Sequence, residues 1–344
     1  MSEPRPFSDA DLTAALRWFQ LSDYPTVGVD KVDLAIRAVA EGQRRRHPVR
    51  EWLHTLKWDG VPRVDTWLIT YCGAVPANEL HAAFIRAIGS KWLISAIARI
   101  EKPGCKVDHC LVLEGPQGGG KSTVFAVLGG EWFTDALPGD LTSKDASDFV
   151  AGVWIVELSE LNQVKRASVE TLKSFITRTT ERFRPAYGRH KSIFRRSCVF
   201  GGSTNQNAYL TDPTGGRRFW PVRIGNINLM ALRADREQLW AEALFRYRQG
   251  EIWWLTEEQT IATAIEEQAA RYEADPWEEA IAAKVAVMTG PITIPYLLKE
   301  VLNIDLGMQR RSESNRVAEI LTSLGLSRGK LSKGVSQWVK INRK

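Results

Sequence analysis

The stretch Gly115-Pro-Gln-Gly-Gly-Gly-Lys121-Ser122 matches the pattern G-x-x-x-x-G-K-[ST] at every fixed position. Ahead of it, Cys110-Leu-Val-Leu-Glu114 predicts a buried strand, and residues 122–128 after it predict the first turns of a helix. Glycines in such a turn let backbone N–H groups converge on an anion, and the helix N-terminus adds its positive end. The stretch therefore predicts the phosphate-binding loop (P-loop) of a nucleoside triphosphatase.

The P-loop supplies the candidate nucleotide-binding residues. Lys121 is expected to reach the β- and γ-phosphates of ATP, and the Ser122 hydroxyl is expected to bind Mg²⁺. A glycine-rich turn that binds nothing is the alternative, and the full motif between a strand and a helix favours the nucleotide site. The expected nucleotide-binding residues are Gly115, Pro116, Gln117, Gly118, Gly119, Gly120, Lys121, Ser122 and Thr123.

A second strand carries an acid in the pattern named Walker B. Residues 152–157 form an apolar run that ends in Glu157, and Leu158, Ser159 and Glu160 follow. A hydrophobic strand beside the P-loop strand brings such an acid to Mg²⁺. Apolar runs that end in an acid are common, so the position of this one downstream of the P-loop carries the argument. Ser122 and Glu157 are the predicted metal ligands.

Composition is that of a soluble globular chain. The 344 residues are 44% apolar and 25% charged, which allows a well-buried core and more than one domain. No signal peptide and no apolar run of membrane-spanning length is present, so we expect a cytoplasmic protein without a membrane partner. The four cysteines lack zinc-ligand spacing, and Cys110 opens an apolar strand, which favours buried thiols.

Positive charge is concentrated in two places. Residues 173–196 carry eight Lys or Arg and one acid, and residues 307–344 carry nine and two, against a net charge of +6 for the chain. Such blocks predict two surfaces that face nucleic acid, with solvated charged faces as the alternative. Residues 182–196 alternate basic with aromatic or apolar residues around a glycine, which predicts a hairpin that tracks phosphates and stacks a base. The predicted DNA-binding residues are Lys173, Arg182, Arg184, Tyr187, Arg189, His190 and Lys191.

Three regions are expected along the chain. Residues 1–70 predict an N-terminal helical region, and residues 71–270 predict an α/β domain whose central parallel sheet is flanked by helices. Residues 276–344 predict helices at 277–288, 294–301 and 315–324, followed by a basic β-wing over 325–340. Three helices and a wing predict a DNA-binding domain of the winged-helix type.

The order of these motifs resembles the virulence-associated E (VapE/VirE) family of phage and mobile-element proteins, which in turn look like superfamily 3 helicases of the AAA+ class. The resemblance spans roughly residues 47–271. The stretches that carry it are Trp58-Asp-Gly60, Gly115 to Thr123, Val156-Glu-Leu-Ser-Glu160, Leu172-Lys-Ser-Phe-Ile-Thr177, Pro185-Ala-Tyr-Gly188, Ser203-Thr-Asn205 and Arg217-Arg-Phe-Trp-Pro221.

The resemblance implies roles for further residues. Asn205 would be sensor 1, which orients the attacking water, and Arg217 or Arg218 would be an arginine finger donated to the ATP of a neighbouring subunit. The hairpin at 182–196 would grip single-stranded DNA inside a homo-oligomeric ring, most simply a hexamer. AAA+ proteins commonly place two acids side by side, whereas Leu158 and Ser159 separate Glu157 from Glu160 here. We expect Glu157 on the metal and Glu160 as the base, with the reverse assignment open.

These features together predict an ATP-dependent DNA helicase or translocase of phage or mobile-element replication, acting with partners such as a primase. Two alternatives stay open. One is an ATPase that loads or remodels a replication protein on DNA without unwinding. The other is a DNA-binding regulator, contacting duplex DNA, whose nucleotide site is structural.

Overall fold

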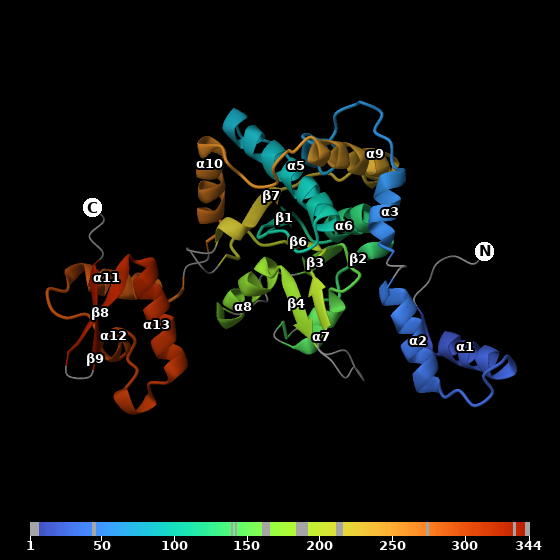
Figure 1. Ribbon diagram of the computed structural model, residues 1–344. Coiled ribbons are helices and arrows are strands. Elements are labelled where there is room, and N and C mark those ends of the chain that lie inside the picture. Colours follow the sequence, from blue (N-terminus) through green and yellow to red (C-terminus); the bar gives the residue numbers. More distant parts are fainter. Residues whose placement is uncertain are drawn as a thin grey trace. The chain divides into compact units, whose positions relative to one another are not determined.

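The computed structural model of the chain describes residues 7–42, 46–138, 140–141, 143–159, 166–183, 192–210, 216–272, 275–332 and 335–340 (Figure 1). Two compact units divide it, Met1–Thr55 and Leu56–Lys344. The N-terminal region predicted from the sequence extends to residue 70, whereas the first unit of the structure ends at Thr55. Residues 63 and 64 belong to the second unit because their backbone N–H groups donate to buried Glu242 of that unit, at 2.6 and 3.0 Å.

Within the described part of the first unit the helices are α1 (Asp9–Leu21), α2 (Val29–Gly42) and α3 (Pro48–Thr55). Helix α1 begins at Asp9, and its N-cap Ser8 donates both its backbone N–H and its hydroxyl to the Asp11 carboxylate, at 2.8 and 2.6 Å. A helical N-terminal segment is thus present as predicted.

A parallel five-stranded sheet forms the centre of the second unit, in the order β2-β3-β6-β1-β7. This confirms the predicted α/β fold with a central parallel sheet. Strand β1 has the bounds that the sequence predicts. The strands are β1 (Cys110–Glu114), β2 (Phe133–Thr134), β3 (Ile155–Ser159), β6 (Val199–Thr204) and β7 (Phe219–Arg223).

Helices cover both faces of this sheet (Figure 1). Helices α5 (Glu79–Glu101), α6 (Lys121–Gly129) and α9 (Leu229–Arg248) lie on one face, and α10 (Glu258–Ala269) packs at the β7 edge. Two buried indoles fix α5, because Trp92 donates to the Phe200 carbonyl at 2.8 Å and Trp154 donates to the Ala96 carbonyl at 3.0 Å. A short helix, α4 (Trp67–Thr70), precedes them and was not predicted.

The opposite face packs on α7 (Lys144–Phe149) and α8 (Arg166–Thr177). Every second residue of the strands points toward these two helices, because side chains alternate between the faces of a sheet. These residues form a core together with side chains of α7 and α8. The buried members include Cys110, Val112, Val156, Leu158, Phe200, Leu172, Phe175 and Ile176. The side chains of Glu157 and Ser203 therefore point the other way, toward α6, and at Gly201 an added Cβ would meet the Phe125 ring of α6.

A two-stranded antiparallel hairpin, β4 (Thr180–Phe183) with β5 (Ser192–Arg195), confirms the predicted hairpin at its base. Buried Arg196 pairs with Glu181, and the Ser147 hydroxyl of α7 donates to the same carboxylate at 2.7 Å. The guanidinium of buried Arg99 donates to carbonyls around that base, at 3.4 Å to Arg196. The hairpin thus rises from a fixed base, while its predicted tip, residues 184–191, lies outside the described residues.

Residues 275–340 form a module with its own core. It comprises α11 (Glu278–Val287), α12 (Ile294–Glu300), a 3₁₀ turn η4 (Leu306–Met308), α13 (Arg311–Ser323) and the antiparallel pair β8 (Leu326–Ser332) and β9 (Val335–Lys340). Ile292 adds a third strand position by bridging to Trp338. The predicted helices and hairpin are present in the predicted order.

Two findings concern the chain as far as it is described. No described helix combines the length and apolar character that a membrane crossing needs. All four cysteines are buried and free, which confirms the buried thiol predicted for Cys110. The described side chains contain no group of three or more His, Cys, Asp or Glu residues that could hold a metal ion.

Candidate nucleotide site

The strand order brings the predicted site residues to one edge of the sheet. Strand β6 lies between β1 and β3, and all three are parallel, so their carboxyl ends meet. The P-loop follows β1, Glu157 lies near the end of β3, and Asn205 follows β6. Residues from three separate stretches of sequence are thereby brought together around the N-terminus of α6.

The P-loop has the backbone geometry that its glycines permit. Gly118 and Gly120 have φ values of 76° and 82°, in the left-handed region that side chains avoid. The Lys121 ammonium turns back and donates to the carbonyls of Gly115 and Pro116, at 2.8 and 2.7 Å. Burial lowers the pKa of Lys121, whose exposed fraction is 9%. A bound phosphate would exchange these two carbonyls for stronger, charged acceptors.

Glu157 is the buried acid of the site. Its Oε1 accepts hydrogen bonds from the Ser122 hydroxyl at 2.7 Å and the Ser203 hydroxyl at 2.6 Å. Its side chain is fully buried, and its Oε2 has no hydrogen-bond partner among the described residues. Burial raises the pKa of Glu157, and the two hydroxyl donors oppose that shift. A buried, unpartnered carboxylate oxygen beside a serine hydroxyl fits Mg²⁺, which binds hard oxygen ligands.

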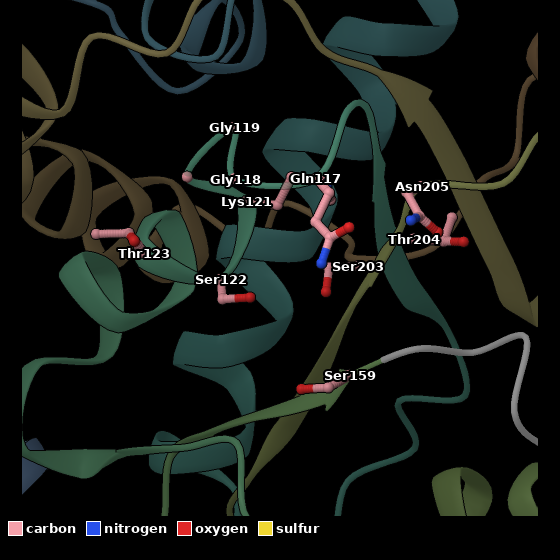
Figure 2. Close-up of a pocket in the computed structure, with 11 residues that line it drawn as sticks. Gln117, Gly118, Gly119, Lys121, Ser122, Thr123, Ser159, Ser203, Thr204 and Asn205 are labelled. Atoms are coloured by element: carbon pink, nitrogen blue, oxygen red, sulfur yellow. The ribbon is translucent and has the colours of Figure 1, made fainter.

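A cavity of about 390 Å³ opens above these groups. Figure 2 shows Ser122, Ser159 and Ser203 around it, with Gln117 reaching over from the loop and Asn205 at the end of β6. The residues that line it are Gln117, Gly118, Gly119, Gly120, Lys121, Ser122, Thr123, Ser159, Ser203, Thr204 and Asn205. The exposed Asn205 thus lies where a sensor 1 residue is expected, and its role stays a prediction.

Sequence reasoning missed Ser159 and Ser203 as site residues. Ser203 belongs to a family-like motif, yet its direct contact with Glu157 was not predicted. Register explains both positions, because Ser159 is opposite Ser203 in the parallel pair of β3 and β6. Counting two residues on from Glu157, and aligning the ends of the two strands, would have found them.

The two candidate arginine fingers lie before the amino end of β7, at the end of the sheet away from the P-loop. Arg217 and Arg218 form the 3₁₀ turn η3 (Gly216–Arg218) directly before β7. Arg223 is opposite Glu114, the last residue before the P-loop, and Arg218 lies five residues earlier on the β7 segment. At about 3.3 Å per strand residue, the turn is therefore about 16 Å from the P-loop along the strand direction. Arg217 is exposed and Arg218 is half-buried, with no partner for its Nε among the described residues. Neither arginine is placed to reach the cavity of its own chain.

The predicted DNA-binding residues divide into three groups. Arg182 is exposed on β4, as a phosphate contact requires. Lys173 is 3% exposed, which corrects its placement on a DNA-facing surface, because α8 turns it inward beside Leu172. The remaining ones, Arg184, Tyr187, Arg189, His190 and Lys191, lie outside the described residues, as does the proposed base Glu160.

A buried ion pair lies directly beneath the P-loop and was not predicted. Arg271, just after α10, binds the Glu114 carboxylate in bidentate fashion, with Nε–Oε1 2.7 Å and Nη2–Oε2 2.8 Å. The Tyr209 hydroxyl donates to the same carboxylate at 2.9 Å. The Arg271 carbonyl in turn accepts from the backbone N–H groups of Tyr209 and Leu210, both at 3.0 Å. The cluster joins the root of the P-loop to the segment that follows Asn205.

Comparison with known proteins gives one family. The family model described as "Virulence-associated protein E-like domain" matches residues 53–273. Among curated proteins no match was found. Solved structures that are similar include the apo structure of the NrS-1 C-terminal region (305–718), with 15% identity, a TM-score of 0.46, and coverage of 84% of this chain and 78% of that one. The A form apo structure of the same region has a TM-score of 0.45 at the same identity and coverage.

Proposed function

The chain belongs to the virulence-associated protein E-like family, and we propose that it is an ATPase that drives a DNA transaction in phage or mobile-element replication. One observation carries the proposal. P-loop residues 117–123 and Asn205, at the end of a neighbouring strand, line one cavity, and the buried acid Glu157 is bonded to two serines that also line it, Ser122 and Ser203. Phosphoryl transfer from ATP needs this combination of phosphate cradle, metal ligand and water-orienting group.

The residues divide the chemical work by charge. The P-loop N–H groups and the α6 N-terminus would hold the phosphates, and Lys121 would leave its two carbonyls to neutralise charge on the β- and γ-phosphoryl oxygens. Ser122 and Glu157 would hold Mg²⁺, which when bound supplies further positive charge to those oxygens. Asn205 would orient the attacking water, and Glu160 would accept its proton.

The remaining positive charge would come from a second copy of the chain. Arg217 and Arg218 lie at the edge of the sheet opposite the P-loop, so within one chain they are separated from the phosphates. In a ring, that edge of one subunit would face the cavity of the next. The exposure of Arg217 makes it the better candidate for the finger. Hydrolysis would then depend on assembly, with a hexamer as the simplest ring.

The DNA would be gripped by the hairpin β4–β5. Its base is fixed by the buried pair of Arg196 with Glu181, so nucleotide-driven movement of the sheet would be transmitted to the tip. The C-terminal module, with helices α11 to α13 followed by a basic hairpin, supports a second, duplex-facing contact of the winged-helix type.

Strand displacement on a forked duplex tests the helicase form of this proposal. We expect ATP-dependent displacement by the wild-type protein and none by Arg189→Ala/Lys191→Ala. The variant should also flatten the salt dependence of single-strand binding, by about 0.7 in slope for each phosphate that it no longer neutralises. Hydrolysis stimulated by DNA without displacement would favour a loader or remodeller. DNA binding without any hydrolysis would favour the regulator.

A further inference from the structure

An acidic residue outside the predicted motifs lies beside the buried acid of the site. Asp135 follows β2 directly, and β2 pairs in parallel with β3, with Phe133 opposite Ile155 and Thr134 opposite Val156. Continued one residue past the end of β2, this register would put Asp135 beside Glu157. Adjacent strands are about 4.8 Å apart, so the two carboxylates would be neighbours at the carboxyl ends of the strands.

Both acids belong to the face of the sheet that α6 covers. At Gly129 of α6, an added Cβ would lie 2.8 Å from the Phe133 Cβ and 3.4 Å from the Ile155 Cβ, so those two residues point at the helix. Side chains two residues further along a strand return to the same face. Asp135 and Glu157 therefore both face the helix toward its N-terminal end, where the P-loop serine is.

Nothing in the described structure uses the Asp135 charge. Its side chain is exposed, and none of the described residues forms a hydrogen bond or an ion pair with it. Like charges at this spacing repel each other. Two neighbouring carboxylates without a cation destabilise the protein that holds them. A pair of this kind, one of them a buried acid with an unpartnered oxygen, is suited to a divalent cation.

We propose that Asp135 is the second carboxylate of the Mg²⁺–nucleotide site, facing the hydrated side of the metal. Mg²⁺ keeps several waters and is held by one or two carboxylates together with phosphate oxygens. Buried Glu157 and the Ser122 hydroxyl occupy the protein side of the site. The exposed Asp135 carboxylate, just after β2, would accept hydrogen bonds from waters of a bound Mg²⁺ and so help to orient the ion. This inference rests on the proposed function, because it assumes that the cavity binds a nucleotide with its metal.

The test is binding of a fluorescent, non-hydrolysable ATP analogue at increasing Mg²⁺ concentration, with Asp135→Asn compared to wild type. Loss of an outer ligand of a metal typically costs about 10- to 100-fold in metal affinity. We expect the Mg²⁺ concentration at half-saturation to rise by at least about tenfold. In EDTA, Asp135→Asn should bind the analogue at least as tightly as the wild type does, because the substitution removes a negative charge that repels the phosphates. Asp135→Glu should restore part of the metal dependence.

Two further measurements separate this role from a structural one. The melting temperature of Asp135→Asn in EDTA should not fall below that of wild type, because the substitution removes a repulsion. Binding of Mn²⁺ in the presence of the analogue, followed by electron paramagnetic resonance, should weaken in parallel with the Mg²⁺ result. Asp148→Asn, an exposed aspartate on α7, is the matched control and should change neither quantity.

Three outcomes would overturn the inference. A wild-type protein whose analogue binding ignores Mg²⁺ overturns the proposed function and this inference with it. A wild-type protein that needs Mg²⁺, with an Asp135→Asn variant that has the same half-saturation, overturns the inference alone. A variant that loses the analogue equally in Mg²⁺ and in EDTA shows a structural role for Asp135.

Discussion

The ion pair beneath the P-loop is expected to be a main determinant of the stability of the sheet. Glu114 is 4% exposed, and the Arg271 side chain is 11% exposed, so neither charge is solvated when its partner is removed. In Arg271→Met the carboxylate would keep only the hydroxyl of Tyr209. Removal of one partner of a buried pair costs about 3–5 kcal/mol in the free energy of unfolding.

A cost of that size is measurable by thermal unfolding. At roughly 2–4 °C per kcal/mol for a unit of this size, Arg271→Met should lower the melting temperature by roughly 6 to 20 °C. Replacement of both partners, Glu114→Gln with Arg271→Met, leaves no buried charge and should recover most of the loss. Arg248→Met, at an exposed arginine of α9, is the control and should melt with the wild type.

Nucleotide affinity should fall in the variants whose melting temperature falls. Glu114 immediately precedes the first P-loop glycine, and the Gly115 N–H donates to the Thr204 carbonyl at 3.2 Å. A displaced Glu114 would therefore shift the loop against the end of β6. A stabilising role of the buried pair is excluded if Arg271→Met melts with the wild type, or if the double variant is as unstable as the single one.

Three further variants test separate parts of the structure. Burial lowers the pKa of His109 to about 3, so as the pH falls below 6.5 only the unfolded chain binds a proton at this histidine, and the folded state loses stability. Between pH 7 and pH 5 the free energy of unfolding of His109→Phe, measured by urea titration, should therefore fall by about 2 kcal/mol less than that of the wild type. Gly201→Ala places a Cβ 2.4 Å from the Phe125 ring, and should cost about 1–3 kcal/mol in urea unfolding. Arg217→Ala or Arg218→Ala should assemble and bind ATP, yet lose about 10³- to 10⁵-fold in turnover.

Controls for these variants come from the same chain. An unaltered slope of stability against pH in His109→Phe would contradict the argument from burial. A Cβ at Gly290 would have no atom within 4 Å, so Gly290→Ala is the control for Gly201→Ala. Equal stability of the two variants would show that the Cβ at position 201 does not clash with Phe125. Mixtures of the arginine variants with Lys121→Ala should recover activity in trans, and normal turnover by both arginine variants would rule out the finger.

Local patterns were enough to predict the parts of the site that are continuous in sequence. The P-loop needs glycines at set positions, and Gly118 and Gly120 adopt the positive φ values that explain them. The strand ending at Glu114 and the acid at Glu157 follow from apolar runs and their terminal carboxylates. In each case the physical cause lies within about ten residues, so the sequence displays it.

Features that depend on register or on distant partners could not be predicted. Glu114 and Arg271 are 157 residues apart, and Glu157 and Ser203 are 46 apart, so only the strand order reveals these contacts. Lys173 shows the converse error, because its charge suggested a surface while α8 turns it inward. Charge counted along the sequence does not say which face of a helix is covered.

We propose that the residues around the cavity above Glu157 hydrolyse ATP in a reaction coupled to DNA. Release of phosphate from ATP, followed with and without single-stranded DNA, measures this most directly, with Lys121→Ala as the matched variant. We expect Mg²⁺-dependent release by the wild-type protein, stimulation of that release by DNA, and loss of both in Lys121→Ala, whose fold should persist by circular dichroism. Equal release by the wild type and Lys121→Ala would contradict it.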